Sequence, residues 1–536
     1  MSLRIQRSAA TIGRRCYASS SSLDAYSKLN TRQWKGTSVD GTPVKNFIGG
    51  KFVPSKATKH YDVHNPATQE VVTRTPQTTP EELRETFAAA QDAFKTWKET
   101  SLFSRQNILF KYQALIRQYQ SEIAACITLE QGKTHADAMG DVFRGLQVVD
   151  TATAIPTLLK GESVEVAKDM DTTSIRTPLG VTAAICPFNF PAMIPLWSIP
   201  TALATGNTLV LKPSERTPGA SMILAELAQE AGVPDGVLSV VHGAHDTVNG
   251  ILDAPEVKAI SFVGGDNAGK YIHGRGTAQG KRVQSNMAAK NHCVLMPDAN
   301  QNDALNGIVG AFAGAAGQRC MALSVLITVG KAKDWVPELV KRAGELHVGS
   351  GFDKSTDVGP VISPVARDRI KGLITQSVEE GAELLLDGRN ASVASLPDGN
   401  WVGPTVLKGK RENVGYKTEI FGPALYILEV ETLDDAIKLI NESPYGNGAS
   451  IYTSSGAAAR YFTHNVEPGQ IGVNVPIPVP VPTFSWSGNK GSFRGDVPFY
   501  GPQGLFFYLQ NKTVTSHWRV QDVDSTRGTV SMPVHQ

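Results

Sequence analysis

Three things are scarce in this chain of 536 residues, and each absence excludes a class of protein. The first is cysteine. The five cysteines, at positions 16, 126, 186, 293 and 320, lie far apart, so their spacing indicates neither a disulfide framework nor a zinc site. The second is net charge, which is only +2 and argues against a surface dedicated to nucleic acid.

The third is an uninterrupted apolar run. The most apolar stretch, residues 181–211, is broken by four prolines and two asparagines, whereas a helix that spans a bilayer needs ~20 largely apolar residues in succession. This stretch is therefore interpreted as buried core, and no membrane segment is expected. With 41% hydrophobic and 19% charged residues the composition is that of a soluble globular protein, and the length predicts two or more lobes.

The first 23 residues differ from the rest of the chain. They hold four arginines, no acidic residue and a run of serines at 19–22, which is typical of a mitochondrial transit peptide. Residues 15–17, Arg-Cys-Tyr, resemble a matrix-protease cleavage site, so localisation in the mitochondrial matrix is expected. The alternative is a disordered tail with chance arginines. Removing the four charges leaves 2 − 4 = −2 on the mature chain, which is still close to neutral.

Helical periodicity dominates the first third of the chain. A helix is predicted over 80–97, because Thr79 can cap it and Glu82 completes a capping box. Longer amphipathic helices are predicted over 104–130 and 134–158.

After residue 180 the pattern changes to short apolar runs separated by helices. An extended pair near 163–176 precedes this region. Alternation of this kind predicts parallel sheets with helices on both faces, which bind ligands at the carboxyl ends of their strands. The predicted strands lie near 181–186, 208–212, 237–241 and 259–263, and then near 293–296, 323–329, 424–430, 449–453 and 471–475.

Cys320 is the first candidate for chemistry. A thiolate is a strong nucleophile, and its attack on an aldehyde gives a thiohemiacetal. Small residues crowd the preceding stretch, 310–317, which suits a segment packed tightly beside a cofactor. From its spacing alone, Cys320 is equally well a structural cysteine.

Five segments, in family order, resemble the aldehyde dehydrogenase superfamily, and the resemblance extends over about residues 45–515. They read Phe-Asn-Phe-Pro at 188–191, Lys-Pro-Ser-Glu at 212–215, Phe-Val-Gly-Gly at 262–265, Gly-Gln-Arg-Cys at 317–320 and Glu-Ile-Phe-Gly-Pro at 419–423. The resemblance implies an α/β fold. It comprises a Rossmann-type NAD-binding domain (45–160 and 178–285), an α/β catalytic domain (286–482) and a small β oligomerisation arm (161–177 and 483–520) that builds a homotetramer.

The same resemblance implies roles for individual residues. Cys320 would be the nucleophile, and Asn189 would donate to the oxygen of the tetrahedral adduct, although a turn asparagine is the simpler interpretation of that residue alone. Glu215 would bind the adenosine ribose and repel a 2′-phosphate, which favours NAD over NADP. Gly265 stands where the family usually has serine. The expected cofactor contacts are Cys186, Phe188, Lys212, Glu215, Arg216, Gly264, Gly265, Glu419 and Phe421, and no metal is expected.

Asn286 is the main departure from the family pattern. Most members carry a glutamate there, which activates water against the enzyme thioester, whereas residues 286–290 here read Asn-Met-Ala-Ala-Lys. An amide is no base at neutral pH, so hydrolysis should be slow. The pattern resembles the branch that transfers its acyl group to coenzyme A as cosubstrate, although Ala288 replaces the glycine of that branch. Drift in an altered enzyme is the alternative.

The small-molecule substrate implied by this branch is methylmalonate or malonate semialdehyde, whose carboxylate needs a cation. Arg144 and Arg319 are the candidates, since arginine binds carboxylates in a bidentate manner. Arg144 could instead belong to a helical salt-bridge row with Asp137 and Asp141, and Arg319 could instead pin its loop. Two other functions stay open: a hydrolytic NAD-dependent aldehyde dehydrogenase, with Glu419 as surrogate base, and a non-catalytic dinucleotide-binding protein.

Overall fold

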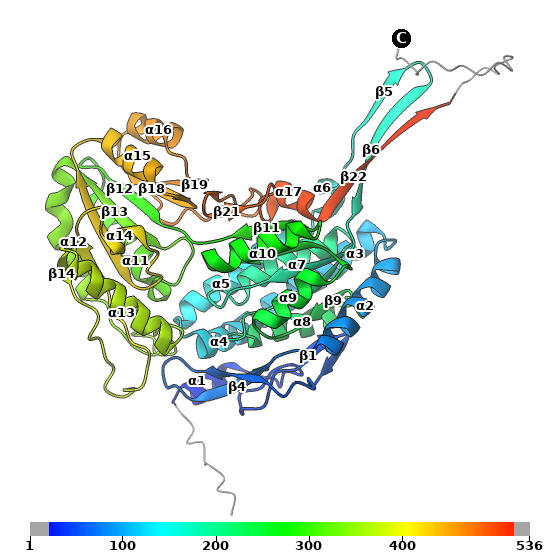
Figure 1. The fold of residues 1–536 in the computed structure, drawn as a ribbon, viewed down its shortest axis with the longest axis horizontal. Helices are drawn as coiled ribbons and strands as arrows, with labels where there is room; N and C mark the ends of the chain where they lie inside the picture. Colours follow the sequence, from blue (N-terminus) through cyan, green and yellow to red (C-terminus); the bar gives the residue numbers. More distant parts are fainter. Residues whose placement is uncertain (1–20, 519–536) are drawn as a thin grey trace, which may run out of the picture.

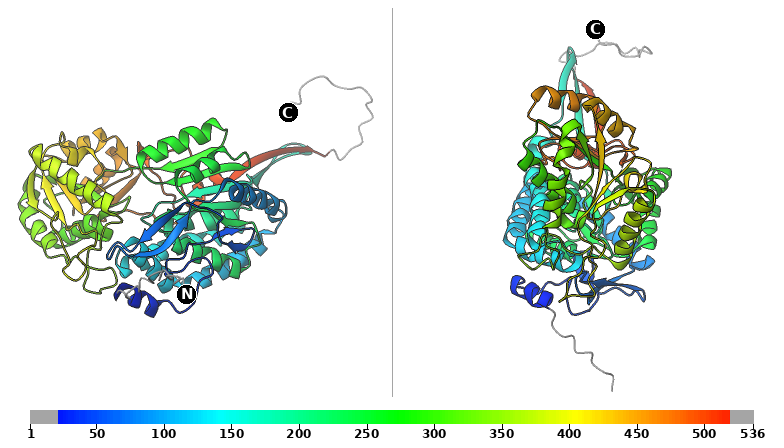
Figure 2. Two further views of the ribbon diagram at one scale, coloured as in Figure 1. Left: turned by 60° about the horizontal axis from the view of Figure 1, so that its bottom comes forward. Right: turned by 90° about the vertical axis from the view of Figure 1, so that its left-hand side faces the viewer.

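The computed structural model describes residues 21–518 and consists of two lobes with a projecting arm (Figure 1). The predicted transit peptide and its cleavage site lie outside the described residues, apart from positions 21–23, which open helix α1 (Ser21–Leu29). Figure 2 shows that the two lobes lie side by side and that the arm leaves the lobe built mainly from the first half of the chain.

The larger lobe is built on an eight-stranded sheet with the order β2-β1-β9-β8-β7-β10-β11-β21. Its five central strands, from β9 to β11, are parallel. Every residue of β7 and β8 is buried, because helices cover both faces of the sheet. The strands are β1 (Asn46–Ile48), β2 (Lys51–Val53), β7 (Val181–Ile185), β8 (Thr208–Lys212), β9 (Leu238–Val240), β10 (Val257–Val263), β11 (Arg282–Asn286) and β21 (Phe493–Arg494).

Alternate residues of β7 pack into two hydrophobic cores, one on each face of this sheet. Ala184 contributes to the core formed with α7 and α8, and Ile185 to the core formed with α2, α9 and α10. Thr79 caps α2 and makes the predicted capping box with Glu82. The helices of this lobe are α2 (Pro80–Trp97), α3 (Leu102–Gln118), α4 (Gln120–Gln131), α5 (His135–Ala152), α6 (Ile155–Leu158), α7 (Met193–Ala204), α8 (Gly219–Ala231), α9 (His245–Asp253) and α10 (Asp266–Ala278).

Two helix predictions were wrong in their continuity. The helix predicted over 104–130 is interrupted at Tyr119, where the backbone leaves the helical region and the ring packs edge-on against Trp34 at 5.3 Å. The helix predicted over 134–158 ends before a separate turn that contains Pro156, since proline has no N–H to continue the ladder and its ring clashes with the carbonyl four residues back. The second break is explained by the covalent geometry of proline, whereas the first coincides with a tertiary contact.

The smaller lobe is built on a seven-stranded sheet with the order β14-β15-β16-β13-β12-β18-β19, parallel except for β14. The predicted strands of this lobe are all present, and β14 and β15 are additions. The strands are β12 (Asn291–Leu295), β13 (Leu323–Val329), β14 (Glu383–Leu386), β15 (Thr405–Lys408), β16 (Ala424–Val430), β18 (Gly448–Tyr452) and β19 (Gln470–Val473). The helices are α11 (Gln301–Ala313), α12 (Val336–Gly344), α13 (Pro364–Glu379), α14 (Val414–Lys417), α15 (Leu433–Glu442) and α16 (Gly456–Asn465).

The arm is a three-stranded antiparallel sheet in which β6 (Met170–Pro178) lies between β5 (Ser163–Ala167) and β22 (Leu509–His517). Within the expected arm segment 483–520, β22 joins the arm, whereas β21 extends the eight-stranded sheet and Trp486 packs into its core. The remaining short elements are β3 (His60–His64), β4 (Val71–Pro76), β17 (Tyr445–Gly446), β20 (Asn489–Lys490) and α17 (Gly501–Gly504).

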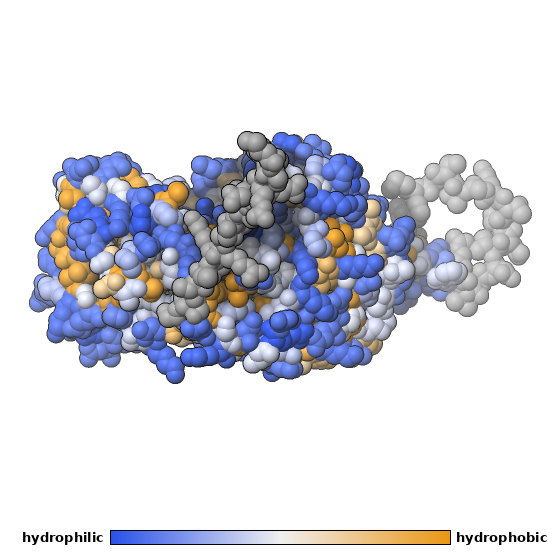
Figure 3. Space-filling view, turned by 90° about the horizontal axis from the view of Figure 1, so that it is seen from below, coloured by the Kyte–Doolittle hydropathy of each residue, from blue (hydrophilic) through white to orange (hydrophobic). Residues whose placement is uncertain are grey.

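The apolar stretch 181–211 folds as β7, α7 and β8 in the centre of the larger lobe. Within residues 21–518, no helix combines the length and apolar character needed to cross a bilayer. The face drawn in Figure 3 is largely hydrophilic, with hydrophobic residues in separate groups.

Candidate active site

Cys320 lies where the two lobes meet, on the loop between α11 and β13. The loop begins with a 3₁₀ turn at Gly314–Gly317 in which Ala315 and Ala316 adopt left-handed φ angles of 50° and 53°. Gly317 follows with φ 69°, and a Cβ there would come within 2.0 Å of the Gly422 carbonyl oxygen, so only glycine fits. This close approach joins residues 314–322, called the nucleophile loop after the role predicted for Cys320, to the segment that carries Glu419.

Two asparagines of the smaller lobe hold the backbone of Cys320 in place. Asn291 Nδ2 donates to the Cys320 carbonyl at 2.9 Å, and Asn447 Nδ2 donates to the same oxygen at 3.1 Å. These bonds do not involve the sulfur. The position of the loop is therefore independent of the thiol.

Two cavities meet at Cys320. The larger one, of about 700 Å³, opens at the carboxyl ends of β7, β8 and β10 and extends from Glu215 and Gly265 to Phe421. The smaller one, of about 360 Å³, lies between α5 and the proline-rich segment 475–482. A thiol shared by two cavities can face one ligand from each side.

The larger cavity gathers all of the expected cofactor contacts except Arg216. The Arg216 side chain is half-exposed and its Nε lies 3.9 Å from the Glu215 carboxylate. Sequence reasoning missed His245 and Tyr271, whose rings pack at 5.5 Å on this cavity wall, and no motif in the sequence marks them. The expected residues on the wall are Cys186, Phe188, Lys212, Glu215, Gly264, Gly265, Glu419 and Phe421.

Both ends of this cavity offer groups suited to a dinucleotide. Lys212 is buried, and its Nζ donates to the carbonyls of Pro213 at 2.7 Å and Gly243 at 2.9 Å, which leaves a third proton for a hydroxyl. Helix α10 begins after Gly265 without a side-chain cap, so the N–H groups of its first turn can bind a phosphate. A Cβ at Gly265 would meet nothing within 4 Å, so the missing serine leaves space there.

Glu419 is held in place at the other end of the larger cavity. Its Oε1 accepts from the Ala289 N–H at 3.0 Å, and Arg369 of α13 donates to the backbone carbonyls of Glu419 at 2.6 Å and Ile420 at 2.8 Å. Phe421 follows with a left-handed φ of 54°. Burial raises the pKa of Glu419 to about 7.

The thiol of Cys320 is protonated in this arrangement. Burial raises its pKa to about 12, and the negative charge of Glu419 adds to that effect, whereas the N–H groups of Cys320 and Met321 act in the opposite direction. Attack on an aldehyde therefore requires loss of a proton from the sulfur.

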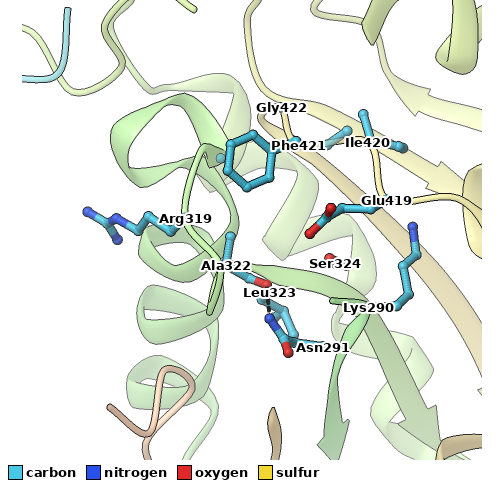
Figure 4. Close-up of a pocket in the computed structure, with 12 residues that line it drawn as sticks. Lys290, Asn291, Arg319, Ala322, Leu323, Ser324, Glu419, Ile420, Phe421 and Gly422 are labelled. Carbon is cyan, nitrogen blue, oxygen red and sulfur yellow. Dashed lines mark hydrogen bonds between the residues drawn. The ribbon is translucent and has the colours of Figure 1, made fainter. Parts of the chain in front are cut away.

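The smaller cavity contains both predicted arginines, in different states. Arg319 is paired with Asp137 at 2.5 Å, and Asp137 also accepts from the Ala315 N–H at 3.0 Å, so this arginine pins the nucleophile loop to α5. Figure 4 shows Arg319 pointing away from Glu419. Arg144 is exposed, and within residues 21–518 its one hydrogen bond is donated to Gln147 Oε1 at 3.3 Å. The possible salt-bridge row along α5 does not form, because Asp141 pairs with Lys133.

Asn189 lines the larger cavity beside the nucleophile loop. Its side chain is 5% exposed, and its Nδ2 donates to the Gln318 carbonyl at 3.0 Å. An amide nitrogen has two protons, so one of them is free for a ligand oxygen. Sequence reasoning did not foresee that its own backbone carbonyl is bound by Lys133.

Asn286 ends β11 and is fully buried. Neither its Nδ2 nor its Oδ1 has a hydrogen-bond partner among the described residues. A Cβ on Gly488 would lie 3.2 Å from Asn286 Oδ1 and 3.3 Å from Asn447 Oδ1, which places this amide one side chain away from the residue that holds Cys320. No basic group stands at this position.

Comparison with known proteins agrees with this geometry. The sequence matches the aldehyde dehydrogenase family over residues 52–514. The chain belongs to this family. The rat mitochondrial protein named methylmalonate-semialdehyde/malonate-semialdehyde dehydrogenase [acylating] is 54% identical over 516 residues, which is 95% of this chain and 96% of the relative.

Solved structures give the same assignment. The methylmalonate-semialdehyde dehydrogenase of Oceanimonas doudoroffii superposes with a TM-score of 0.88 at 41% identity and covers 90% of this chain and 99% of its own. An aldehyde dehydrogenase of Bacillus cereus, solved with NAD⁺, superposes with a TM-score of 0.85 at 28% identity and covers 89% and 97% of the two chains. The predicted α/β aldehyde dehydrogenase fold is confirmed.

Proposed function

We propose that this family member oxidises methylmalonate or malonate semialdehyde with NAD and transfers the acyl group from Cys320 to coenzyme A. The observation that carries the proposal is a nucleophilic thiol between two cavities with an amide, Asn286, in place of the usual base. The printed name of the rat relative, which includes the word acylating, supports the same reaction.

The first step joins the sulfur to the aldehyde carbon. Cys320 loses its proton to solvent, and its sulfur bonds to the aldehyde carbon while the C=O π electrons move onto the oxygen. That oxygen accepts hydrogen bonds from the free N–H of Asn189 and the backbone N–H of Cys320. A donor of this kind typically lowers the barrier by about 3 kcal/mol. NAD bound in the larger cavity would supply a hydride acceptor, and loss of hydride from the adduct would leave the acyl group on Cys320 as a thioester.

Residues of the larger cavity fit NAD along its length. The third proton of Lys212 and the carboxylate of Glu215 are placed for ribose hydroxyls, the start of α10 for the pyrophosphate, and Glu419 for the second ribose. The carboxylate of Glu215 would repel a 2′-phosphate, which supports NAD over NADP.

The thioester has three possible fates: decarboxylation, hydrolysis and transfer. An acyl group with a β-carboxylate can lose carbon dioxide through an enolate, whose oxygen would occupy the same donors at Asn189. Hydrolysis needs a base to activate water, and the amide of Asn286 cannot act as a base at neutral pH. The thiol of coenzyme A is therefore the productive acceptor, and it regenerates Cys320.

Arg144 is the cation proposed to select acidic semialdehydes, because Arg319 is already paired with Asp137. Replacing Arg144 by Gln should lower kcat/KM for malonate semialdehyde about 30-fold, within the range of a lost charge-assisted hydrogen bond, and change kcat/KM for propanal less than threefold. Steady-state kinetics with both aldehydes measure this ratio. Equal losses for both substrates would remove Arg144 from substrate selection.

A product assay tests the function as a whole. Purified enzyme is incubated with NAD and each semialdehyde, with and without coenzyme A, and the acyl products are separated by mass. We expect propionyl- or acetyl-coenzyme A, and a marked fall in turnover when coenzyme A is omitted. Free acid formed at the same rate without coenzyme A would favour the hydrolytic alternative.

The proposed cellular setting is the mitochondrial matrix. The name of the rat relative includes the word mitochondrial, and the arginine-rich residues 1–23 support import into the matrix. The arm formed by β5, β6 and β22 carries exposed apolar residues, which supports its role in assembling a homotetramer. These residues are Val164, Ile175 and Val514.

A further inference from the structure

We propose that the buried ion pair between Lys133 and Asp141 positions Asn189, so that Lys133 and Asp141 are positioning residues for the oxyanion donor. This role rests on the proposed function, in which Asn189 binds the oxygen of the adduct. The ion pair would set the position of this donor and would not select the substrate.

The Lys133 side chain is only 1% exposed, and its ammonium group contacts the residue that carries the oxyanion donor. Its Nζ donates to the Asn189 carbonyl at 2.6 Å and to Asp141 Oδ2 at 3.1 Å. The same ammonium lies 4.1 Å from the centroid of the Phe190 ring, within cation–π range. Its contacts thus include both the oxyanion residue and the residue that follows it.

Asp141 holds the far end of the same loop. Its Oδ1 accepts from the Met193 N–H at 2.7 Å, at the start of α7, while its Oδ2 accepts from Lys133. The loop between β7 and α7, residues 186–192, has no regular secondary structure of its own. The ion pair is therefore a clamp that fixes the loop at Asn189 and at Met193.

The clamp reaches the nucleophile through a single residue. The Asn189 backbone oxygen is bound by Lys133, and the Asn189 side chain donates to the Gln318 carbonyl, two residues before Cys320. A small rotation of Asn189 would alter its distance to the adduct oxygen, and oxyanion donors lose their effect over such displacements.

A charged pair in this place calls for an explanation other than stability. Removing two charges from water costs more than the pair usually returns, and apolar replacements are often neutral or stabilising. Both side chains line the smaller cavity beside Cys320, where a fixed direction matters. A buried pair at this position is explained if it fixes the geometry of Asn189.

The test is the double variant Lys133→Met with Asp141→Asn, which removes both charges at similar volume and keeps an acceptor for Met193. In a single turnover without coenzyme A, the rate of NADH formation should fall about 10- to 100-fold, part of the roughly 10²- to 10³-fold effect of losing a whole oxyanion donor. KM values should change less than threefold. Alkylation of Cys320 by iodoacetamide should change less than twofold, because that displacement develops no oxyanion.

A coupling experiment separates positioning from general structural damage. In an Asn189→Ala background the double variant should cause less than a twofold further loss, because the donor it positions is already absent. Lys281→Met is the matched control: Lys281 is also buried and donates to the Ala254 and Val257 carbonyls, away from the site, so it should leave the single-turnover rate unchanged.

Three results would overturn the inference: an unchanged single-turnover rate, a parallel loss of alkylation, or full additivity with Asn189→Ala. If the double variant does not fold, Lys133→Gln, whose amide is about one bond too short to reach the Asn189 carbonyl, is judged by the same criteria. The same single-turnover measurements are made with propanal as a second aldehyde. If the wild-type enzyme oxidised propanal but neither semialdehyde, the proposed function would be wrong, and the positioning of Asn189 would still be tested with propanal.

Discussion

Replacing Cys320 by Ala should lower turnover at least about 10⁴-fold, which is the scale of loss when a covalent nucleophile is removed. No other thiol in the described chain can substitute for it, because Cys126, Cys186 and Cys293 are all buried. Cys186 also lines the larger cavity, but it is buried, whereas Cys320 is partly exposed. NADH formation with malonate semialdehyde and coenzyme A measures the loss.

The fold of this variant should be intact, because the Cys320 backbone is held by Asn291 and Asn447 rather than by its sulfur. Binding of NAD, followed by quenching of tryptophan fluorescence, should therefore change less than threefold. Cys293→Ala is the matched control, since this thiol lies on β12 outside both cavities and its loss should leave turnover within twofold. A Cys320→Ala enzyme that keeps a tenth of its turnover would refute the covalent mechanism.

Replacing Asn286 by Glu should convert the enzyme towards hydrolysis. A general base typically contributes 10²- to 10⁴-fold, so release of free acid without coenzyme A should rise about 100-fold, the lower end of that range. The lower end is expected because the site is fully buried and favours the neutral acid. Mass analysis of the acyl products gives the partition between free acid and thioester.

Hydrolysis by the Asn286→Glu variant should increase with pH. Burial at this position raises the pKa of an introduced carboxyl above its solution value, and only the ionised form can accept a proton from water. Hydrolysis should be low at acidic pH and rise as pH increases through that raised pKa. For the same reason the variant should lose stability as pH rises above the ordinary pKa of glutamate, because the folded state disfavours the charge.

Asn286→Gln is the control, since it has the length of glutamate without its basicity. It should stay dependent on coenzyme A at every pH. If Asn286→Glu and Asn286→Gln gave the same product partition, the absence of a base would not explain the choice of acceptor.

Much of the chemistry could be predicted from the order of short segments. Cys320, Lys212 and Glu419 lie far apart in sequence, yet the resemblance placed them on one cavity, and the structure brings them together there. Strands were predictable because apolar runs of four to seven residues between turns are typical of a buried parallel sheet. The start of α2 was predictable because a capping box is local in sequence.

Polar partners across the fold could not be predicted. Asp137 and Asp141 stand three to seven residues from Arg144, so helical spacing favoured pairing among them. Instead Asp137 binds Arg319, 182 positions away, and Asp141 binds Lys133. Helical spacing shows which residues of α5 share a face, but the partner of each charged side chain depends on which segment packs against that face. The local sequence does not contain that information.

The sequence by itself indicated the reaction type, through its resemblance to the aldehyde dehydrogenase family rather than through spacing. Given that resemblance, a thiol at 320 and an amide at 286 favour capture of an acyl group over activation of water. Only the tertiary structure decided which arginine lacks a carboxylate partner among the described residues. Arg319 and Arg144 have the same side chain, but Arg319 pairs with Asp137 whereas Arg144 is exposed on the smaller cavity, because ion pairs depend on neighbours that the fold brings from distant parts of the chain.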